Sequence, residues 1–242
     1  MKLKITIEKN KQNIFFTSDP HFGHKNIVRG TSSWTDQTRD FNTVEEHDSF
    51  LIDRLNERVK CNDILFILGD FTFKGYHTKD YTEVKNYRNR INCKNIYFVY
   101  GNHDEVIEKN KDLQDMFKGV SYYFNLTIKI TEHNTPTLKY KFDLSHYSKR
   151  TWAGLYSGVI MLYGHSHNML EEYVDKSGKH LKTMDVGVDT KKDFSPYSLK
   201  EILSIMESKD SPDLDSRING VEKNIKNTLK SFFIKIINRI FA

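Results

Sequence analysis

Residues 95–104, NIYFVYGNHD, form an apolar run that stops at a cluster of polar side chains. A short apolar run bounded by glycine is typical of a strand that is buried on both faces. Three other apolar runs end in the same way: residues 13–18 before Asp19-Pro20-His21, residues 63–68 before Gly69-Asp70, and residues 158–163 before Gly164-His165-Ser166-His167. Because sites in open α/β sheets form beyond the carboxyl ends of the strands, we expect these four clusters to meet.

The spacing of apolar residues elsewhere predicts the remaining elements. Thr43 and Glu46 form a capping-box pattern ahead of apolar residues at helical spacing, which predicts a helix over 44–60. The pattern predicts further helices over 79–91, 105–117 and 198–207, and further strands over 2–7, 121–130, 137–144 and 180–186. Alternating strands and helices in the first half indicate a mainly parallel sheet, and consecutive strands in the second half indicate antiparallel pairing.

Composition indicates a globular protein with a packed interior. The 242 residues include 38% hydrophobic and 13% aromatic residues, more than a disordered chain carries. Cys61 and Cys93 are isolated, which favours a reducing compartment. Charges interrupt the apolar runs of the N-terminus, and no apolar run is long enough to span a membrane, so we expect a cytoplasmic protein. The net charge of +5 permits an anionic substrate without requiring one.

The polar clusters carry a mixture of metal-ligating atoms. They offer carboxylate oxygens, imidazole nitrogens and one amide oxygen, from Asn102, but no thiolate. This mixture suits Mn, Fe, Zn or Ni better than Mg or Ca, which prefer oxygen ligands throughout. A structural zinc site usually contains thiolates and four protein ligands. The clusters hold too many ligands for one ion, which favours two catalytic metals.

Five sequence blocks resemble those of the calcineurin-like metallophosphoesterases. In the order of that family, they are Asp19-x-His21, Gly69-Asp70, Gly101-Asn102-His103-Asp104, His146 and Gly164-His165-x-His167. The resemblance covers about residues 13–190 and implies a four-layer α/β/β/α sandwich with its site at one rim of two sheets. It also implies hydrolysis of a phosphate ester by a metal-bound hydroxide.

The resemblance implies a role for each residue of these blocks. One metal would be bound by Asp19, His21 and His167, the other by Asn102, His146 and His165, and Asp70 would bridge both. His103 would lie beside the phosphate as a catalytic residue, and Asp104 would accept a hydrogen bond from its imidazole. We expect two divalent ions, Mn²⁺ before Fe, Zn or Ni.

Each residue also has a simpler interpretation. His146 alone is more often a surface or core histidine, Asp70 alone is often a helix cap, and Asn102 alone is often a turn residue. These interpretations leave the shared position at strand ends unexplained. His24, which follows the first block, could support the ligands or contact substrate, and structural packing is an equally good interpretation. Asn26 and Arg29 could contact the phosphate, and a solvated face is at least as good an interpretation for them.

Other polar residues fall outside the blocks. Asp185 and Asp189 resemble a segment that lies near the site in this family, and we expect a structural or supporting role for them. Four histidines match no block and are expected to face solvent: His47, His77, His133 and His180.

The C-terminal residues 208–242 form an extension beyond a phosphoesterase domain that spans 1–207. Apolar residues from Val221 to Phe241 follow helical spacing, and lysines and arginines occupy much of the other face. The pattern predicts an amphipathic helix that packs on its own domain or mediates homo-oligomerisation. The alternative is a basic helix that associates with an anionic membrane surface or nucleic acid.

Three functions are compatible with this sequence. The preferred one is a phosphodiesterase that acts on nucleotides or nucleic acid. The alternative is a phosphomonoesterase or protein phosphatase, for which Arg29, Arg39 and Arg150 are candidate residues to grip a dianion. The third is a non-catalytic scaffold with the same fold, ranked last because His103 and every expected ligand are present.

Overall fold

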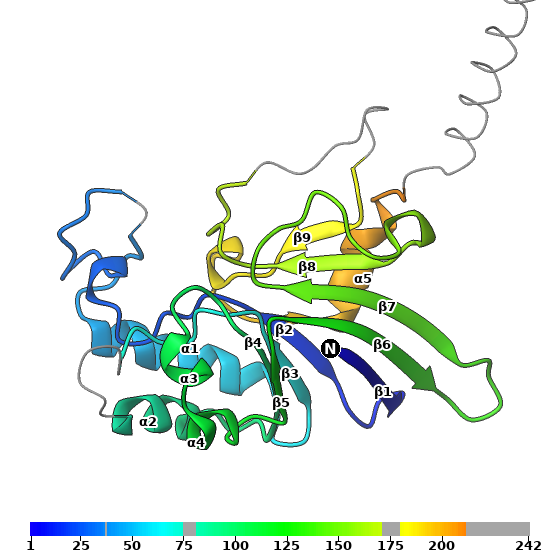
Figure 1. Ribbon diagram of the computed structural model, residues 1–242, viewed down its shortest axis with the longest axis horizontal. Coiled ribbons are helices and arrows are strands. Elements are labelled where there is room, and N and C mark those ends of the chain that lie inside the picture. The colour runs from blue at the N-terminus through cyan, green and yellow to red at the C-terminus, as the bar shows by residue number, and fades with distance from the viewer. Residues whose placement is uncertain (37, 75–80, 171–179, 212–242) are drawn as a thin grey trace, which may run out of the picture.

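Two five-stranded sheets pack face to face in the computed structural model, which describes residues 1–36, 38–74, 81–170 and 180–211 (Figure 1). The first sheet has the strand order β10 (Tyr197–Ser198), β2 (Ile14–Thr17), β3 (Ile64–Ile67), β4 (Asn95–Val99) and β5 (Gly119–Ser121). The second has the order β1 (Lys2–Glu8), β6 (Tyr123–Thr131), β7 (Leu138–Ser145), β8 (Ile160–Tyr163) and β9 (Thr183–Asp185). The predicted α/β fold is confirmed.

Aromatic side chains fill the space between the two sheets. Phe16 of β2 and Phe66 of β3 are paired across parallel strands, and their rings stack with centroids 5.2 Å apart. Phe142 of the second sheet lies 5.6 Å from Phe16, and Phe124 lies 6.3 Å from Phe66. Because successive side chains of a strand point to opposite faces, alternate residues of β2 and β3 are left to pack against helices on the other side.

Four helices cover the outer face of the first sheet: α1 (Val44–Arg58), α2 (Thr82–Arg90), α3 (Glu105–Glu108) and α4 (Lys111–Gln114). Thr43 caps α1, since its side chain accepts a hydrogen bond from the Glu46 backbone at 3.1 Å. Leu51 and Leu55 of α1 are buried in the cluster that includes Leu65 of β3. The predicted helix over 44–60 is confirmed.

The single helix predicted over 105–117 is wrong. The chain forms two short helices, α3 and α4, with a break at Lys109 and Asn110. The side chain of Asn110 accepts a hydrogen bond from the Leu113 backbone and so caps the start of α4. Asparagine favours such a cap over a helix interior because its side chain competes for backbone hydrogen bonds.

The second sheet contains less antiparallel pairing than predicted. β6 and β7 are antiparallel, but β1 pairs with β6, β7 with β8 and β8 with β9 in parallel. The parallel pairing of β7 and β8 is made possible by a crossover that contains η2 (Leu155–Ser157). Several outward-facing residues of β1 and β6, among them Lys4 and Lys129, are exposed.

α5 (Leu199–Glu207) begins directly after β10, at the edge of the first sheet. Ser198 and Glu201 form a capping box at its start. Leu199, Ile202 and Met206 are buried in the core between the sheets. Of the predicted C-terminal extension, residues 212–242 lie outside the described residues. Among those described, no helix is both long and apolar enough to cross a membrane.

Candidate metal centre

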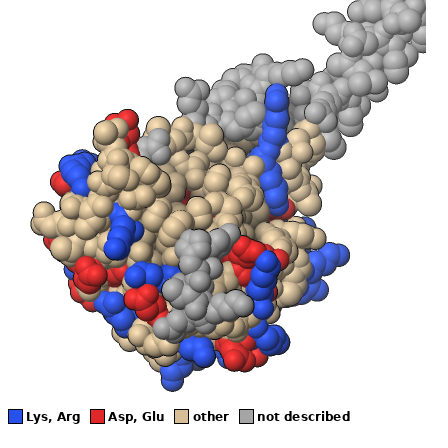
Figure 2. Space-filling model, turned by 60° about the vertical axis from the view of Figure 1, so that its left-hand side comes forward, with Lys and Arg blue, Asp and Glu red and all other residues tan. Residues whose placement is uncertain are grey.

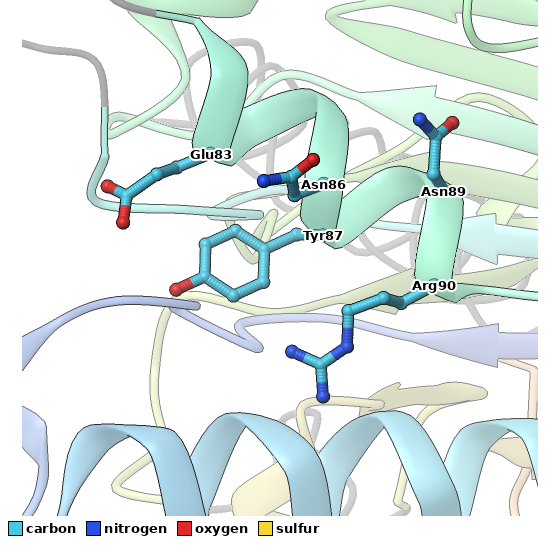
Figure 3. A pocket seen from close by; sticks show the side chains of 5 residues that line it. All are labelled: Glu83, Asn86, Tyr87, Asn89 and Arg90. Carbon is cyan, nitrogen blue, oxygen red and sulfur yellow. The ribbon is translucent and has the colours of Figure 1, made fainter.

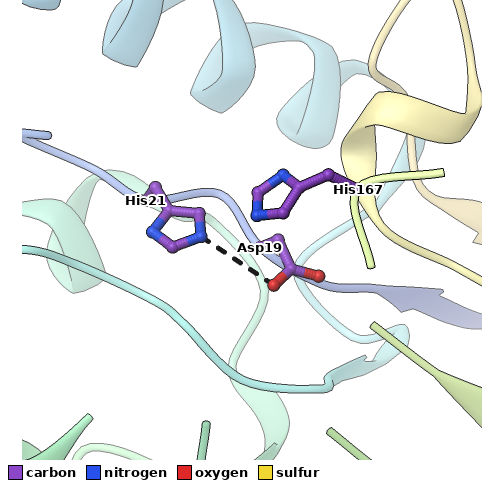
Figure 4. Close-up of side chains that lie close together, drawn as sticks. All are labelled: Asp19, His21 and His167. Atoms are coloured by element: carbon purple, nitrogen blue, oxygen red, sulfur yellow. Dashed lines mark ion pairs between the residues drawn. The ribbon is translucent and has the colours of Figure 1, made fainter. Parts of the chain in front are cut away.

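The polar clusters at the strand ends meet in two groups of metal-ligating side chains. The first group consists of Asp19, His21 and His167, and the second of Asp70, His146 and His165. Within each group, one ligand atom of every residue lies within 4.8 Å of the others. Figure 4 shows the first group, in which His21 and Asp19 follow β2 and His167 comes from the loop after β8.

Asp70 connects the two groups. Its Oδ2 lies 3.5 Å from Nε2 of His21 and 3.5 Å from Nε2 of His146. Asn102 lies beside the second group, with its Oδ1 3.0 Å from Nε2 of His146. The structure thus brings all seven predicted ligands together at the rim of the two sheets.

The backbone at the candidate ligands is strained. Of the nine non-glycine residues with positive φ in the described chain, five belong to the two groups: Asp19, His21, Asp70, His165 and His167. Side chains rarely adopt this left-handed region, and such strain concentrates at functional sites. Hydrogen bonds hold the conformation: the backbone N–H of Asp19 donates to the Gly69 carbonyl at 3.0 Å, and that of His21 to the Asp70 carbonyl at 3.0 Å.

Two glycines allow the loops to approach this closely. Gly69 has φ of +103°, and a Cβ there would lie 2.4 Å from Nδ1 of His146. A Cβ on Gly164 would lie 2.4 Å from Oδ2 of Asp19. Any larger residue would therefore displace a member of one ligand group, which explains glycine at both positions.

Two histidines are oriented with Nε2 toward the other ligands. His146 donates from Nδ1 to the Leu68 carbonyl at 2.8 Å, and His167 donates from Nδ1 to Asp189 at 2.7 Å. A hydrogen bond at one ring nitrogen fixes the tautomer and leaves the lone pair of the other nitrogen for a metal.

An arginine braces the first group. Arg39 is 4% exposed, and all five of its N–H groups have acceptors. They donate to both Asp189 oxygens, to the carbonyls of Asp19 and Pro20, and to Nε2 of His47. Asp189 thus supports His167 while it is held by Arg39, in agreement with the supporting role expected for it.

The predicted solvent exposure of His47 is wrong. Its side chain is fully buried between Arg39 and Asp48, and since Arg39 donates to Nε2, Nδ1 must donate to Asp48 at 2.8 Å. His47 lies on the apolar stripe of α1, and this periodicity is the signal that could have placed it inside. Asp185 supports the neighbouring loop by accepting hydrogen bonds from Ser166 and Asn168.

Asp104 has different partners from the one expected. Its carboxylate is fully buried and accepts hydrogen bonds from the backbone N–H groups of Asp70, Phe71 and Gly101. No bond to the His103 imidazole is among its contacts in the described chain. Asp104 therefore ties the loops after β3 and β4 together and contacts the backbone of Asp70.

His103 lies beside both ligand groups. Its backbone N–H donates to Oδ1 of Asp70 at 2.9 Å, and its ring centroid lies 5.5 Å from that of His21. The side chain is half-buried, so it can reach a ligand that approaches from solvent.

The electrostatics of the site favour a bound cation. Burial, reinforced by Asp70, raises the pKa of Asp19 to about 8 although His167 opposes the shift. Burial also lowers the pKa of His21 well below its usual value, and that of His146 below it, so both imidazoles are neutral with free lone pairs. Oδ1 of Asp19 and both ring nitrogens of His21 are buried with no hydrogen-bond partner in the described chain. Divalent cations would supply the missing charge and partners, so the donor set fits two metal ions.

The three predicted substrate residues lie in different surroundings. His24 is buried beside the first group, with its ring 5.6 Å from that of His21. Asn26 accepts hydrogen bonds from Ser33 and so holds its own loop together. Arg29 donates to Asp40 at 2.9 Å, and both side chains are exposed.

The described part of the chain has two surface hollows of several hundred Å³. One, of 710 Å³, is lined by Asn168, which follows the candidate ligand His167 in the sequence, and by Asp185, Lys149 and Arg150. The other, of 430 Å³, lies at α2 and is lined by Glu83, Asn86, Tyr87, Asn89 and Arg90 (Figure 3). None of the residues that line the second hollow is a candidate metal ligand.

Comparisons with known proteins agree with this geometry. The family model described as calcineurin-like phosphoesterase matches residues 13–193. The Methanocaldococcus jannaschii protein MJ1445, itself uncharacterised, is 30% identical over 80% of this chain and 91% of its own length. The gene 66 protein of Mycobacterium phage L5 is 26% identical over 73% of this chain and 86% of its own length.

A solved structure shows the same fold. The protein AQ665 from Aquifex aeolicus, of unknown function, superposes with a TM-score of 0.53 at 22% identity, over 81% of this chain and all of its own. The chain belongs to the calcineurin-like phosphoesterase family, and it is a phosphoric ester hydrolase with two groups of side chains that could each hold a metal ion.

Proposed function

We propose that this protein is a phosphodiesterase that uses two divalent metal ions to hydrolyse a nucleotide or nucleic-acid substrate. The observation that carries the proposal is the meeting of the two ligand groups at Asp70, whose Oδ2 lies 3.5 Å from a histidine of each. Asp19, His21 and His167 would hold one ion, and Asn102, His146 and His165 the other, with Asp70 shared between them.

The bound ions would supply Lewis acidity, which stabilises charge on phosphate oxygens and lowers the pKa of a coordinated water. The residues of the chain orient the ions and the substrate. Asp104 fixes the loop of Asp70 through three backbone hydrogen bonds, and Arg39 with Asp189 fixes His167. His103, which is half-buried beside both groups, would donate a proton or hydrogen bond to the leaving oxygen.

The arginines favour a diester over a monoester. A monoester is a dianion at neutral pH and is usually held by free guanidinium groups. Arg39 has no free donor, and Arg29 is paired with Asp40. Arg150, in the lining of the 710 Å³ hollow, is the remaining candidate of the three and supports the monoesterase as a second possibility.

Two further proposals concern the metal and the compartment. Mn²⁺ is the metal that we propose first, because the groups combine imidazole nitrogens with carboxylate oxygens. The cytoplasm is the proposed compartment because Cys61 and Cys93 are both free thiols.

A comparison of two substrates tests the proposed activity. Purified protein with Mn²⁺ is offered bis-p-nitrophenyl phosphate and p-nitrophenyl phosphate. We expect faster turnover of the diester, whereas preference for the monoester would support a phosphatase. If neither compound is hydrolysed with any of the metals Mn²⁺, Zn²⁺, Ni²⁺ and Fe²⁺, the result would support the non-catalytic scaffold.

The variant His103→Ala tests the role of His103. We expect it to lose most turnover, by about 10²–10⁴-fold, as is typical for loss of a general acid. Both ions should stay bound because the backbone N–H of residue 103, which contacts Asp70, is retained. Loss of metal, measured by inductively coupled plasma mass spectrometry, would show that the side chain serves the metal centre instead.

A further inference from the structure

Exposed aromatic side chains surround the two ligand groups. Trp34 is 51% exposed, Phe73 is 41% exposed and Tyr147 is 51% exposed. Exposed apolar patches that are rimmed by polar residues mark surfaces that contact a ligand, whereas a single exposed apolar residue carries no such meaning, so the neighbours of each aromatic side chain decide. We define Phe73 with Trp34 as the first rim and Tyr147 as the second rim.

The first rim lies beside His103 and is built on His24. The ring of Phe73 stacks on that of His24 with centroids 4.0 Å apart and an angle of 15°, and it lies 5.0 Å from the ring of His103. The rings of Trp34 and His24 are nearly perpendicular, with centroids 5.4 Å apart. The Phe73 backbone is fixed by a 2.9 Å bond to the Phe22 carbonyl. Phe73 is therefore held in place, yet nearly half of its side chain remains open.

His24 gives an independent indication of a ligand at this rim. Its side chain is only 8% exposed, and its Nδ1 has no hydrogen-bond partner in the described chain. A buried imidazole nitrogen without a partner is costly unless a bound molecule supplies one. His24 lies between the first rim and His21 of the metal centre, so such a molecule would contact both.

The second rim lies beside the other ligand group. The ring of Tyr147 lies 4.6 Å from that of His165 and 5.0 Å from that of His146. Its hydroxyl donates to Oδ1 of Asn102 at 3.4 Å. Each rim thus adjoins a different ligand group, and a phosphate held by both groups would have an open aromatic side chain on either side.

We propose that Phe73 and Tyr147 stack the bases that flank the scissile phosphate, so that the substrate is single-stranded nucleic acid. This inference rests on the proposed phosphodiesterase activity. Every base has a π-face that stacks on aromatic rings, whereas the bases of a duplex are covered by their neighbours and sugar or lipid head groups have no π-face. On the face displayed in Figure 2, basic and acidic side chains of the described residues are interspersed.

The test compares two oligonucleotides with the same backbone. The metal-loaded full-length protein is given oligothymidylate and an oligomer of equal length in which the bases are replaced by abasic tetrahydrofuran units. We expect kcat/KM for oligothymidylate to exceed that for the abasic oligomer by roughly 10-fold or more, as the stacking of one to two bases provides. Phe73→Leu and Tyr147→Leu should each reduce this ratio by about 5-fold or more.

Two variants control for loss of structure. Phe73→Tyr keeps the π-face and should keep the ratio, whereas Phe50→Leu alters a phenylalanine of similar exposure, 37%, on α1 and should also keep it. Equal rates on the two oligomers, or a ratio that is unchanged in both leucine variants, would overturn the inference and leave the phosphodiesterase proposal standing. If neither oligomer is hydrolysed while p-nitrophenyl phosphate is, both proposals are wrong.

Discussion

The two ligand groups are built differently although both contain Asp70 or lie beside it. In the first group, Asp19 and His21 are buried and His167 is half-buried, and a buried arginine braces the group through Asp189. In the second group, His165 is exposed, and Asn102 and Tyr147 are exposed beside it. From this difference we infer that the first group would hold its ion more firmly, whereas the second would exchange its ion more readily and would be open to substrate.

Asp70 belongs to both groups, so its replacement is expected to have the largest effect. Asp70→Asn keeps the volume but removes the shared negative charge, and we expect weaker binding of both ions and a loss of turnover of more than about 100-fold, beyond what loss of a supporting residue causes. Metal content by mass spectrometry and initial rates check this. Asp63→Asn, at a buried aspartate that accepts hydrogen bonds from Asn13 and Lys60, should keep both ions. Retention of two ions by Asp70→Asn would refute the shared ligand.

Replacement of Arg39, which supports the first group through Asp189, should weaken binding of the first ion selectively. Arg39→Met leaves the Asp189 carboxylate without its partner, so we expect the affinity for the first ion to fall about 10- to 100-fold and the free energy of unfolding to fall by about 3 kcal/mol. Calorimetric titration of the metal-free protein with Mn²⁺ should show one weakened site and one unchanged site. Arg29→Met removes an exposed ion pair and should change stability by no more than about 1 kcal/mol. Equal weakening of both sites would contradict a brace specific to the first group.

The two glycines allow each group to be disturbed separately. The Cβ of Gly164→Ala would press on Asp19 of the first group, and that of Gly69→Ala on His146 of the second. We expect each variant to lose about 1–3 kcal/mol of stability and to weaken mainly the site it touches. Calorimetric titration of both variants would reveal the site affected. Gly119→Ala is the control, since its Cβ would approach no described atom closer than 3.3 Å. If both variants weakened the same site, the two groups would not be independent.

The smallest effect should come from a residue remote from both groups. Burial would raise the pKa of Glu201, but hydrogen bonds from Arg58, Lys191 and Ser198 lower it to about 2, from its usual value of 4.5. A carboxyl whose pKa is depressed on folding stabilises the protein above pH 4.5, and this contribution fades as the pH falls toward 2.

Glu201→Gln should therefore lower stability by up to about 1 kcal/mol at pH 7, because it removes the charge that pairs with Arg58 and Lys191, and by less at pH 3. Urea unfolding of the metal-free protein at both pH values measures the difference. Metal content at pH 7 should not change. A larger effect at pH 3 than at pH 7 would show that the assigned partners of Glu201 are wrong.

Much of the fold and most of the candidate site could be predicted because apolar strands ended at polar clusters. Parallel strands end at one edge, so Asp19, Asp70 and Asn102 had to be close once β2, β3 and β4 were recognised. His165 follows β8 of the second sheet, so its position beside them depends on how the two sheets pack. The contact between Arg39 and Asp189 could not be found in this way. Arg39 lies in an irregular loop, and its partner Asp189 is 150 residues away, so no local periodicity connects them.

Local competition explains the other differences. Asn110 restarts a helix that the apolar pattern alone would have continued, and the crossover between β7 and β8 gave no helical pattern to signal a parallel pair. The resemblance to the family implied that Asp104 accepts a hydrogen bond from the His103 imidazole. Its actual partners are three backbone N–H groups, two of them more than 30 residues away, which only the folded loops bring within reach.

Anomalous diffraction from a crystal of the Mn²⁺-loaded protein tests the shared metal centre most directly. We expect two manganese peaks roughly 3.5–4 Å apart, with the Asp70 carboxylate between them. A single peak, or two peaks of which only one contacts Asp70, would contradict a dinuclear site.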